Sequence, residues 1–227
     1  MSDFLALNTP ISLEDISTLD ELSLSSLSRM KDMRFSITGA NGFLASNIIY
    51  YLHVLSSSLQ LNLHVTALCR SRSRFLARFT SDYFLSNSFR NSNLTYSKYS
   101  FTEFPDIPPS QVVIHAASNA SPASYSQDPK STSLVNTLGT INAIEHAKKS
   151  NSKCFVYLST SGIYGFNNSH ISTYSEKDFG FIDPADSKNI YIESKRLGEC
   201  ITSTLCSQYN IPFVILRPSI NYGPGLN

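Results

Sequence analysis

Charge is scarce in this sequence and nearly balanced in sign. Charged residues make up 15% of the 227 residues, and the formal net charge is +1. So small an excess gives no electrostatic reason to expect nucleic acid or an acidic membrane surface as a partner. The 41% of hydrophobic residues is typical of a globular protein, and the length favours one main domain. We therefore expect a globular protein that binds neither nucleic acid nor a membrane.

The cysteines lack the spacing of a metal site or a disulfide framework. Cys69, Cys154, Cys200 and Cys206 form no C-x-x-C pair and lie near no histidine cluster. Cys69 and Cys154 fall in apolar runs typical of strands, where buried structural thiols are expected. No metal site is therefore predicted.

Two kinds of apolar segment are also missing. The N-terminus carries Asp3, Glu14 and Asp15 and has no basic stretch followed by an apolar one, so it does not resemble a secretory signal. No apolar run approaches the roughly 18–20 residues that a membrane span requires. We therefore expect a cytoplasmic protein.

Apolar runs rich in β-branched and aromatic residues alternate with helical patterns along the chain. The predicted strands are 34–38, 63–69, 94–99, 111–117, 153–159 and 212–218. The predicted helices include 43–55, 70–79, one that ends near 145–151, and 189–208. This alternation predicts an α/β fold, with a parallel sheet covered on both faces and a ligand crevice at the carboxyl ends of its strands.

The segments outside this pattern are predicted to be an extension and loops. Residues 1–33, rich in leucine and serine, indicate one or two short amphipathic helices that precede a main domain spanning 34–227. A loop is expected to run through Pro122 and Pro129, and most of 160–188 is expected to be loop as well.

A glycine-containing turn, "TGANGFLA", follows the first predicted strand and opens a helix. Gly39 and Gly42 permit a tight turn and close approach of the backbone to a pyrophosphate, whose charge the helix N-terminus would meet. Ala45 stands where a third glycine would allow close helix packing. The turn predicts a dinucleotide site, although a strand-to-helix turn can need glycine for its own geometry alone.

Arginine follows the second predicted strand, where a carboxylate would bind the ribose 2'-hydroxyl of NAD. Arg70, with Arg72 and Arg74 close behind, can instead accommodate the 2'-phosphate of NADP. A solvated basic start of a helix explains the three arginines equally well. Either NAD or NADP therefore remains a candidate cofactor.

A phenol and an ammonium are paired in "YIESK". On a helix, Tyr191 and Lys195 lie on one face, about 5–6 Å apart at Cβ; an ordinary surface pair is the alternative. Ser159, Thr160 and Ser161 follow a strand, where hydroxyls bind a substrate oxygen or cap the loop. The ammonium and a cationic nicotinamide ring would lower the tyrosine pKa from about 10. The phenolate could then take a proton from a sugar hydroxyl as hydride leaves the same carbon.

The motifs "TGANGFLA", "HAAS", "STSGIYG", "YIESK" and "RPSINYGPG" occur in this order. With them, residues 34–227 resemble the extended short-chain dehydrogenase/reductase family, in the NAD-dependent epimerase/dehydratase group that acts on nucleotide sugars. The stretch "HAASNASPASYSQDP" is most similar to the branch that contains UDP-glucuronate decarboxylases. The resemblance implies a Rossmann-type doubly wound parallel sheet with helices on both faces.

The resemblance also implies a role for each matching position. The cofactor, NAD or NADP, would lie against Gly39, Gly42, Phe43, Ala45, Arg70, Ala116, Ala117, Lys195, Pro218 and Ser219. The nucleotide sugar would lie against Ser118, Ser161 and Asn221. Thr160 would hydrogen-bond the reacting hydroxyl, Tyr191 would be the general base, and Lys195 would hold the nicotinamide ribose. Asn136 would be a structural residue near the site, and a homodimer through the helix that bears Tyr191 is expected.

Two departures from the family pattern shape the expected activity. Dehydratases carry an acidic pair after the hydroxyl residue and decarboxylases a glutamate two positions after the threonine, but Ser161 and Gly162 stand here. A redox step at sugar C4, as in a 4-epimerase of surface-polysaccharide precursor synthesis, needs no such carboxyl group. Family members continue beyond "YGPG" into a substrate-binding part, whereas this chain ends at Asn227. Decarboxylase or dehydratase chemistry, and a dinucleotide-binding fragment without catalysis, are the alternatives.

Overall fold

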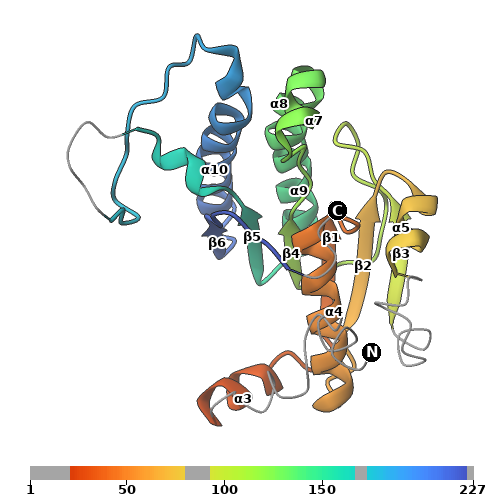
Figure 1. Cartoon of the computed structure of the whole chain (residues 1–227). Coiled ribbons are helices and arrows are strands. Elements are labelled where there is room, and N and C mark those ends of the chain that lie inside the picture. The colour runs from red at the N-terminus through yellow and green to blue at the C-terminus, as the bar shows by residue number, and fades with distance from the viewer. Residues whose placement is uncertain (1–20, 80–92, 167–172, 224–227) are drawn as a thin grey trace, which may run out of the picture.

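The computed structural model describes residues 21–79, 93–166 and 173–223 (Figure 1). Its sheet has six strands: β1 (Arg34–Thr38), β2 (His64–Cys69), β3 (Leu94–Lys98), β4 (Val112–His115), β5 (Cys154–Leu158) and β6 (Phe213–Leu216). All neighbouring strands pair in parallel, in the order β3-β2-β1-β4-β5-β6. This is the strand order of a doubly wound dinucleotide-binding sheet, and it confirms the predicted fold.

In the part of the chain that the structure describes, one helix precedes the first strand, and the other helices lie in the connections between strands. They are α3 (Glu21–Ser28), α4 (Phe43–Ser58), α5 (Arg72–Phe79), α7 (Pro122–Gln127), α8 (Pro129–Asn136), α9 (Leu138–Lys149) and α10 (Ile190–Gln208). Two short 3-10 helices, η1 (Ser161–Tyr164) and η2 (Ser187–Asn189), precede α10. Within the described residues, no helix is long and apolar enough to cross a membrane.

The prediction of a loop through Pro122 and Pro129 was wrong, because both prolines begin helices. A proline at the first helical position loses no intrahelical hydrogen bond, since its N–H would be unpaired there anyway. Each helix is also capped: Ser121 accepts a hydrogen bond from the N–H of Ser124 at 3.3 Å, and Asp128 accepts one from Ser131 at 3.0 Å. The prolines therefore start α7 and α8.

Helices cover both faces of the sheet, as two successive residues of β4 show. Ile114 packs in a buried cluster with α4 residues such as Ile49, whereas Val113 packs with Ile144 of α9 and Cys206 of α10. Successive side chains of a strand point to opposite faces. In Figure 1, α4 accordingly crosses the sheet on one side, and α8, α9 and α10 stand together on the other.

The order of the strands reverses between β1 and β4, which lie side by side. Thr38 and His115, their last residues, are paired in register, and the Thr38 hydroxyl accepts hydrogen bonds from the N–H groups of Ala116 and Ala117, both at 3.1 Å. The chain leaving β1 and the chain leaving β4 are therefore in contact where the two strands end. A doubly wound sheet binds its ligand in the crevice that opens here.

The N-terminal extension can be compared with its prediction only in part, because residues 1–20 lie outside the described residues. From Glu21 the chain is helical in α3, and Met30 and Met33 pack against the buried cluster around β1 and α4. The division into an extension of 1–33 and a domain of 34–227 stays a proposal.

Candidate active site

The turn after β1 has a geometry that glycine alone satisfies. Gly39 has φ +67°, in the left-handed region that side chains with a Cβ rarely adopt. A Cβ there would also lie 2.7 Å from the Cα of Ala117. The turn after β1 therefore presses directly against the chain after β4, and the sequence needs glycine at this position for packing as well as for the backbone.

The N-terminus of α4 opens toward the same crevice. Gly42 precedes α4 without a side-chain cap, and the first turn of the helix holds no acidic residue. The N–H groups of Phe43, Leu44 and Ala45 have no partner inside the helix, and these residues line a cavity. Unpaired N–H groups at a helix N-terminus fit a phosphate or pyrophosphate.

Two cavities, of about 520 Å³ and about 190 Å³, adjoin at Gly39, Gly42, Ala116 and Ser118. The larger is lined by twelve of the predicted site residues: Gly39, Gly42, Phe43, Ala45, Ala116, Ser118, Thr160, Tyr191, Lys195, Pro218, Ser219 and Asn221. Arg70 and Ala117 line the smaller. Ser161 lines neither; its N–H donates instead to the Pro218 carbonyl at 2.9 Å. The structure therefore brings together all the predicted positions except Ser161.

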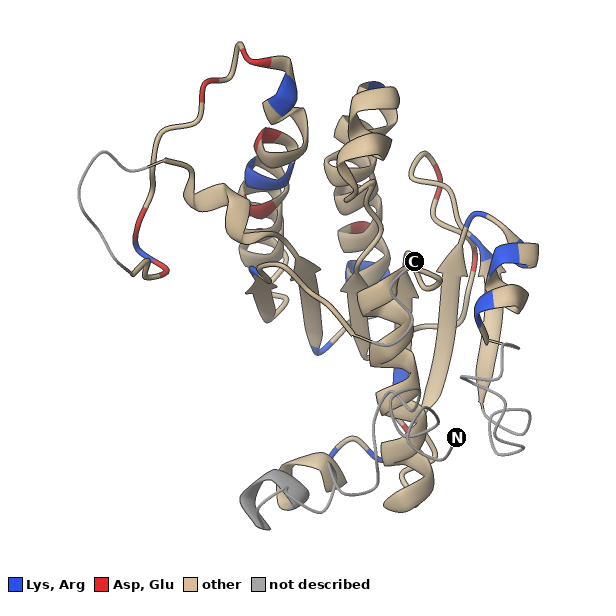
Figure 2. Cartoon of the chain, viewed as in Figure 1, with Lys and Arg blue, Asp and Glu red and all other residues tan. Residues whose placement is uncertain are grey.

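Of the three arginines after β2, Arg70 lines the smaller of these two cavities, and Arg72 and Arg74 line neither. Arg72 and Arg74 lie on α5 and are exposed; Figure 2 shows the basic positions that follow the carboxyl end of β2. The charge of Arg70 contributes to lowering the pKa of Asp128, after the hydrogen bonds that this carboxylate accepts from Ser131. Arg70 therefore lies near the start of α8, which the sequence pattern did not indicate.

Lys195 is buried at 2% exposure, and its ammonium donates to the Leu158 carbonyl at 2.6 Å. The same nitrogen lies 4.9 Å from the centroid of the Tyr157 ring. Burial lowers the pKa of Lys195 to about 7, and the charge of Glu199 acts in the opposite direction. This ammonium therefore titrates near neutral pH and is held at the end of β5, at the wall of the larger cavity.

The pKa of Tyr191 is raised rather than lowered in the protein by itself. Burial is the main cause, Tyr125 adds to it, and the hydrogen bond with the Thr160 side chain works against it. The lowering of this pKa by Lys195 that the sequence predicted is not seen: the ammonium donates to the Leu158 carbonyl, and burial dominates the pKa of the phenol. The part of that prediction that concerns a nicotinamide ring stays a prediction.

Sequence reasoning missed several neighbours of these groups. The Tyr125 ring is stacked on Tyr191, with centroids 5.3 Å apart and an interplanar angle of 13°. Ser159, which the sequence did place in the crevice, has a buried hydroxyl beside the larger cavity without a hydrogen-bond partner among the described residues. Tyr125 lies in the quoted stretch "HAASNASPASYSQDP", but sequence spacing gave no sign that α7 would pack against α10.

A chain of side-chain hydrogen bonds joins the "HAAS" loop to α10. Ser118 donates to Asn136 at 2.8 Å, and Asn136 donates to Ser194 at 2.9 Å. Asn136 is fully buried, which agrees with the structural role that the resemblance implied. Among the described residues, no group of histidine, cysteine, aspartate and glutamate side chains could hold a metal ion.

The sequence profile of the NAD dependent epimerase/dehydratase family matches residues 35–227. The chain belongs to this family. UDP-glucuronic acid decarboxylase 2 of Arabidopsis thaliana is 26% identical over 198 residues, which cover 86% of this chain and 40% of that protein. UDP-glucuronic acid decarboxylase 1 of Xenopus tropicalis is 30% identical over 115 residues, or 51% of this chain and 27% of that protein. These relatives confirm the resemblance to the decarboxylase branch.

Solved structures of nucleotide-sugar epimerases share the fold. The UDP-glucuronic acid 4-epimerase from Bacillus cereus, solved in complex with NAD, superposes with a TM-score of 0.63 at 23% identity, over 85% of this chain and 58% of that one. The UDP-glucose 4-epimerase from Thermotoga maritima, solved with UDP-glucose, gives 0.62 at 21% identity, over 82% of this chain and 55% of that one. The matches thus span 27–40% of the two decarboxylases and 55–58% of the two epimerase structures.

Proposed function

We propose that the protein is an NAD(P)-dependent oxidoreductase or 4-epimerase that acts on a nucleotide sugar by transient hydride transfer at C4. The observation that carries the proposal is the wall of the larger cavity. Thr160, Tyr191 and Lys195 line it together with residues of the Gly39–Ala45 turn, and no aspartate or glutamate of the described residues lines either cavity. The site has groups for moving a hydroxyl proton and none for moving a proton on carbon.

The cofactor fits this site on physical grounds. The unpaired N–H groups of Phe43, Leu44 and Ala45 suit a pyrophosphate, and the buried, unpartnered Ser159 hydroxyl offers a hydrogen bond to a ligand beside Lys195. NAD or NADP, when bound, supplies the group that accepts the hydride.

Each polar side chain then has a separate task. Thr160 orients the sugar hydroxyl. Tyr191, which shares a hydrogen bond with Thr160, takes the hydroxyl proton in its phenolate form, which the positive charge of a bound nicotinamide ring would favour. Lys195 places an ammonium at the wall where a ribose would lie. Return of the hydride to the other face of the same carbon inverts C4 without loss of any atom from the sugar.

A decarboxylase is the second candidate, because the curated relatives named above carry that activity. The position of the missing glutamate, Gly162, has little space: a Cβ there would lie 3.3 Å from Ile192. If the protein is an epimerase, we expect Gly162→Glu not to raise its activity. Gly162→Gln, which adds a side chain of similar size without the charge, is the control. A rise in carbon dioxide release that occurs with glutamate and not with glutamine would favour the decarboxylase.

A dinucleotide-binding protein without turnover is the third candidate. Ile220 and Tyr222 flank the cavity residue Asn221 and are 92% and 88% exposed. The wall against which a sugar would lie is therefore open to solvent in the described residues. This candidate differs from the other two in binding a cofactor and no sugar.

Calorimetric titration separates these candidates. The chain would be titrated with NAD, then with NADP, and then with UDP-, dTDP-, CDP- and GDP-sugars in the presence of the better cofactor. We expect tight binding of one dinucleotide and of one sugar class. Cofactor binding without any sugar binding would favour the third candidate, and no cofactor binding would contradict the proposal.

Location and assembly are proposals as well. All four cysteines are free thiols, as is usual in the cytosol, which supports a cytoplasmic location. Leu197 on α10 is 51% exposed, which supports a homodimer through this helix. Cell fractionation and sedimentation velocity test the two proposals.

A further inference from the structure

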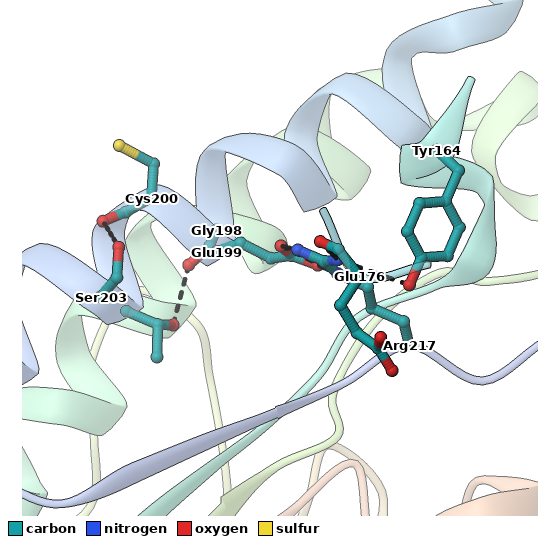
Figure 3. A network of polar contacts seen from close by, with 8 residues as sticks. Tyr164, Glu176, Gly198, Glu199, Cys200, Ser203 and Arg217 are labelled. Atoms are coloured by element: carbon teal, nitrogen blue, oxygen red, sulfur yellow. Dashed lines mark hydrogen bonds and ion pairs between the residues drawn. The ribbon is translucent and has the colours of Figure 1, made fainter. Parts of the chain in front are cut away.

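The row of polar side chains on α10 continues beyond Lys195. Tyr191, Lys195 and Glu199 follow each other at intervals of four, so they lie on one face of the helix. Glu199 is 9% exposed and forms an ion pair with Arg217, with 2.7 Å between Nη2 and Oε2. The Arg217 Nε donates to both carboxylate oxygens, at 3.0 and 3.3 Å. The guanidinium thus binds the carboxylate in a bidentate manner (Figure 3).

Arg217 also reaches the turn that carries Thr160. Its Nη1 donates to the Tyr164 hydroxyl at 3.4 Å and to the Glu176 carbonyl at 3.1 Å (Figure 3). Tyr164 is the last residue of η1, and Thr160 caps the first turn of that helix. One side chain therefore contacts both the helix of Tyr191 and the 3-10 helix that starts at Thr160.

The residues after Arg217 form part of the cavity itself. Pro218, Ser219 and Asn221 line it, and the Pro218 carbonyl accepts the N–H of Ser161. The contacts that hold the Arg217 side chain in place therefore also restrict the position of the cavity wall that follows it in the chain. The ion pair joins three pieces of the site that come from different parts of the sequence.

The charge of Glu199 matters for Lys195 because few charges lie nearby. Tyr157 from β5, His115 from β4 and Tyr191 from α10 are the other titratable groups around the ammonium. Burial raises the pKa of both tyrosines and lowers the pKa of His115 to about 3, so all three are neutral at neutral pH. Among these described groups, Glu199 alone carries a charge opposite to that of Lys195, whereas the Arg217 guanidinium, which pairs with Glu199, carries the same charge as Lys195.

We propose that Glu199 and Arg217 are positioning residues of the hydride-transfer site: Glu199 places a carboxylate one helical turn from Lys195, and Arg217 holds Glu199, the Thr160 turn and the Pro218–Asn221 wall in one arrangement. This inference rests on the proposed function. Glu199 and Arg217 act through Lys195 and the wall and need not touch the substrate.

The first test follows the Lys195 ammonium directly, by carbon NMR of the full chain labelled at the lysine ε-carbon. The Lys195→Met variant assigns the signal. In Glu199→Gln we expect this signal to titrate at a lower pH than in the wild type, because a carboxylate is removed and the shape is kept. An unchanged midpoint would contradict the electrostatic half of the proposal. No substrate is needed, so the result stands even if the proposed function fails.

A charge swap separates this role from a purely structural one. Glu199→Arg with Arg217→Glu re-forms an ion pair but places the positive partner on α10, next to Lys195. We expect the free energy of unfolding, measured in urea, to return toward the wild-type value. The midpoint of the Lys195 titration should move to a lower pH than in Glu199→Gln. Recovery of both stability and titration would mean that the pair serves the fold alone. If the swapped chain does not fold, Glu199→Gln still decides the matter.

Arg217→Lys tests whether the geometry of the Arg217 contacts matters for the site. The substitution keeps the positive charge but loses the two-pronged hydrogen bonding of the guanidinium to the carboxylate. We expect turnover to fall by up to about 10²-fold, as misplacement of a site wall by about 1 Å can do. The matched control is Arg196→Lys, since Arg196 pairs with Glu193 at 3.4 Å on the same helix with both side chains 34% exposed. Equal effects of the two substitutions would overturn the positioning role of Arg217. Where no variant turns over any sugar, the NAD dissociation constant is compared instead, with the same expected difference.

Discussion

The two sides of the cavity are built from different materials. The side at the Gly39–Ala45 turn consists of backbone N–H groups and apolar residues, and its geometry depends on a left-handed glycine. The side at Thr160, Tyr191 and Lys195 consists of polar side chains, and burial shifts the pKa values of Tyr191 and Lys195. The first side should therefore respond to changes of shape and not to pH, whereas the second side should respond to pH as well.

The largest effect is expected on the backbone side, from Gly39→Val. The left-handed backbone alone costs a residue with a Cβ about 1–2 kcal/mol, and the clash with Ala117 adds to this cost. We expect loss of dinucleotide binding in calorimetry, with reduced stability in urea. Gly42→Ala is the control, because Gly42 has φ −72° and its Cβ would be 3.0 Å from a single carbonyl oxygen. If the two variants bound the dinucleotide equally well, the backbone geometry at Gly39 would not determine dinucleotide binding on this side of the cavity.

The next effect is expected on the polar side, from Tyr191→Phe. Removal of the hydroxyl should lower turnover by about 10²–10⁴-fold, the usual contribution of a general base. Cofactor affinity should change little, because the ring and its stacking on Tyr125 remain. Steady-state kinetics and calorimetry measure the two quantities. Equal loss of turnover and affinity would make Tyr191 a structural residue.

The polar side should also make stability depend on pH. The pKa of Lys195 is about 7 in the folded protein and 10.5 ordinarily, so between these values the unfolded chain binds more protons. The free energy of unfolding should therefore rise with pH in this window, by at most about 1.4 kcal/mol per pH unit from this residue. Lys195→Met should flatten the rise in urea unfolding, whereas the exposed Lys188→Met should not. If the free energy of unfolding changed with pH in the same way in the wild type and both variants, the lowered pKa of Lys195 would be refuted.

The smallest effect is expected from Arg70→Asp, at the far end of the smaller cavity. An aspartate there would repel a 2'-phosphate and could accept a hydrogen bond from a ribose hydroxyl. We expect the ratio of NADP to NAD affinity to fall by about tenfold, the value of one good charged hydrogen bond. Arg72→Asp, on exposed α5, is the control. A ratio that does not change would make Arg70 an ordinary surface charge.

Much of this site could be predicted because its elements carry local signals. The strand 34–38 was predicted with the bounds of β1, and the glycine turn and "YIESK" were placed correctly at the carboxyl end of the sheet. The starts of α7 and α8 were missed because a proline in the sequence suggests a loop, unless the residue before it is recognised as the N-cap of a helix. The ion pair of Glu199 and Arg217 joins a helix to a strand end, and a contact between separate elements has no signature in residue spacing.

The direction of the Tyr191 pKa shift could not be predicted for a similar reason. Helical spacing puts Lys195 on the same face as Tyr191, but the direction of its ammonium depends on the Leu158 carbonyl, which belongs to β5. Burial by α7 and α8 then dominates the pKa of the phenol. Pattern reasoning found the residues, whereas their electrostatics required the packed structure.

The central claim is that hydride leaves C4 of a nucleotide sugar and returns to it. The most direct test is to incubate the chain and its cofactor with UDP-glucuronate or UDP-glucose that carries deuterium at C4, and to examine the product by NMR and mass spectrometry. The account predicts a product of unchanged mass, with C4 inverted and the deuterium retained there. Loss of carbon dioxide or water, or a product whose C4 deuterium has exchanged with solvent, would contradict it.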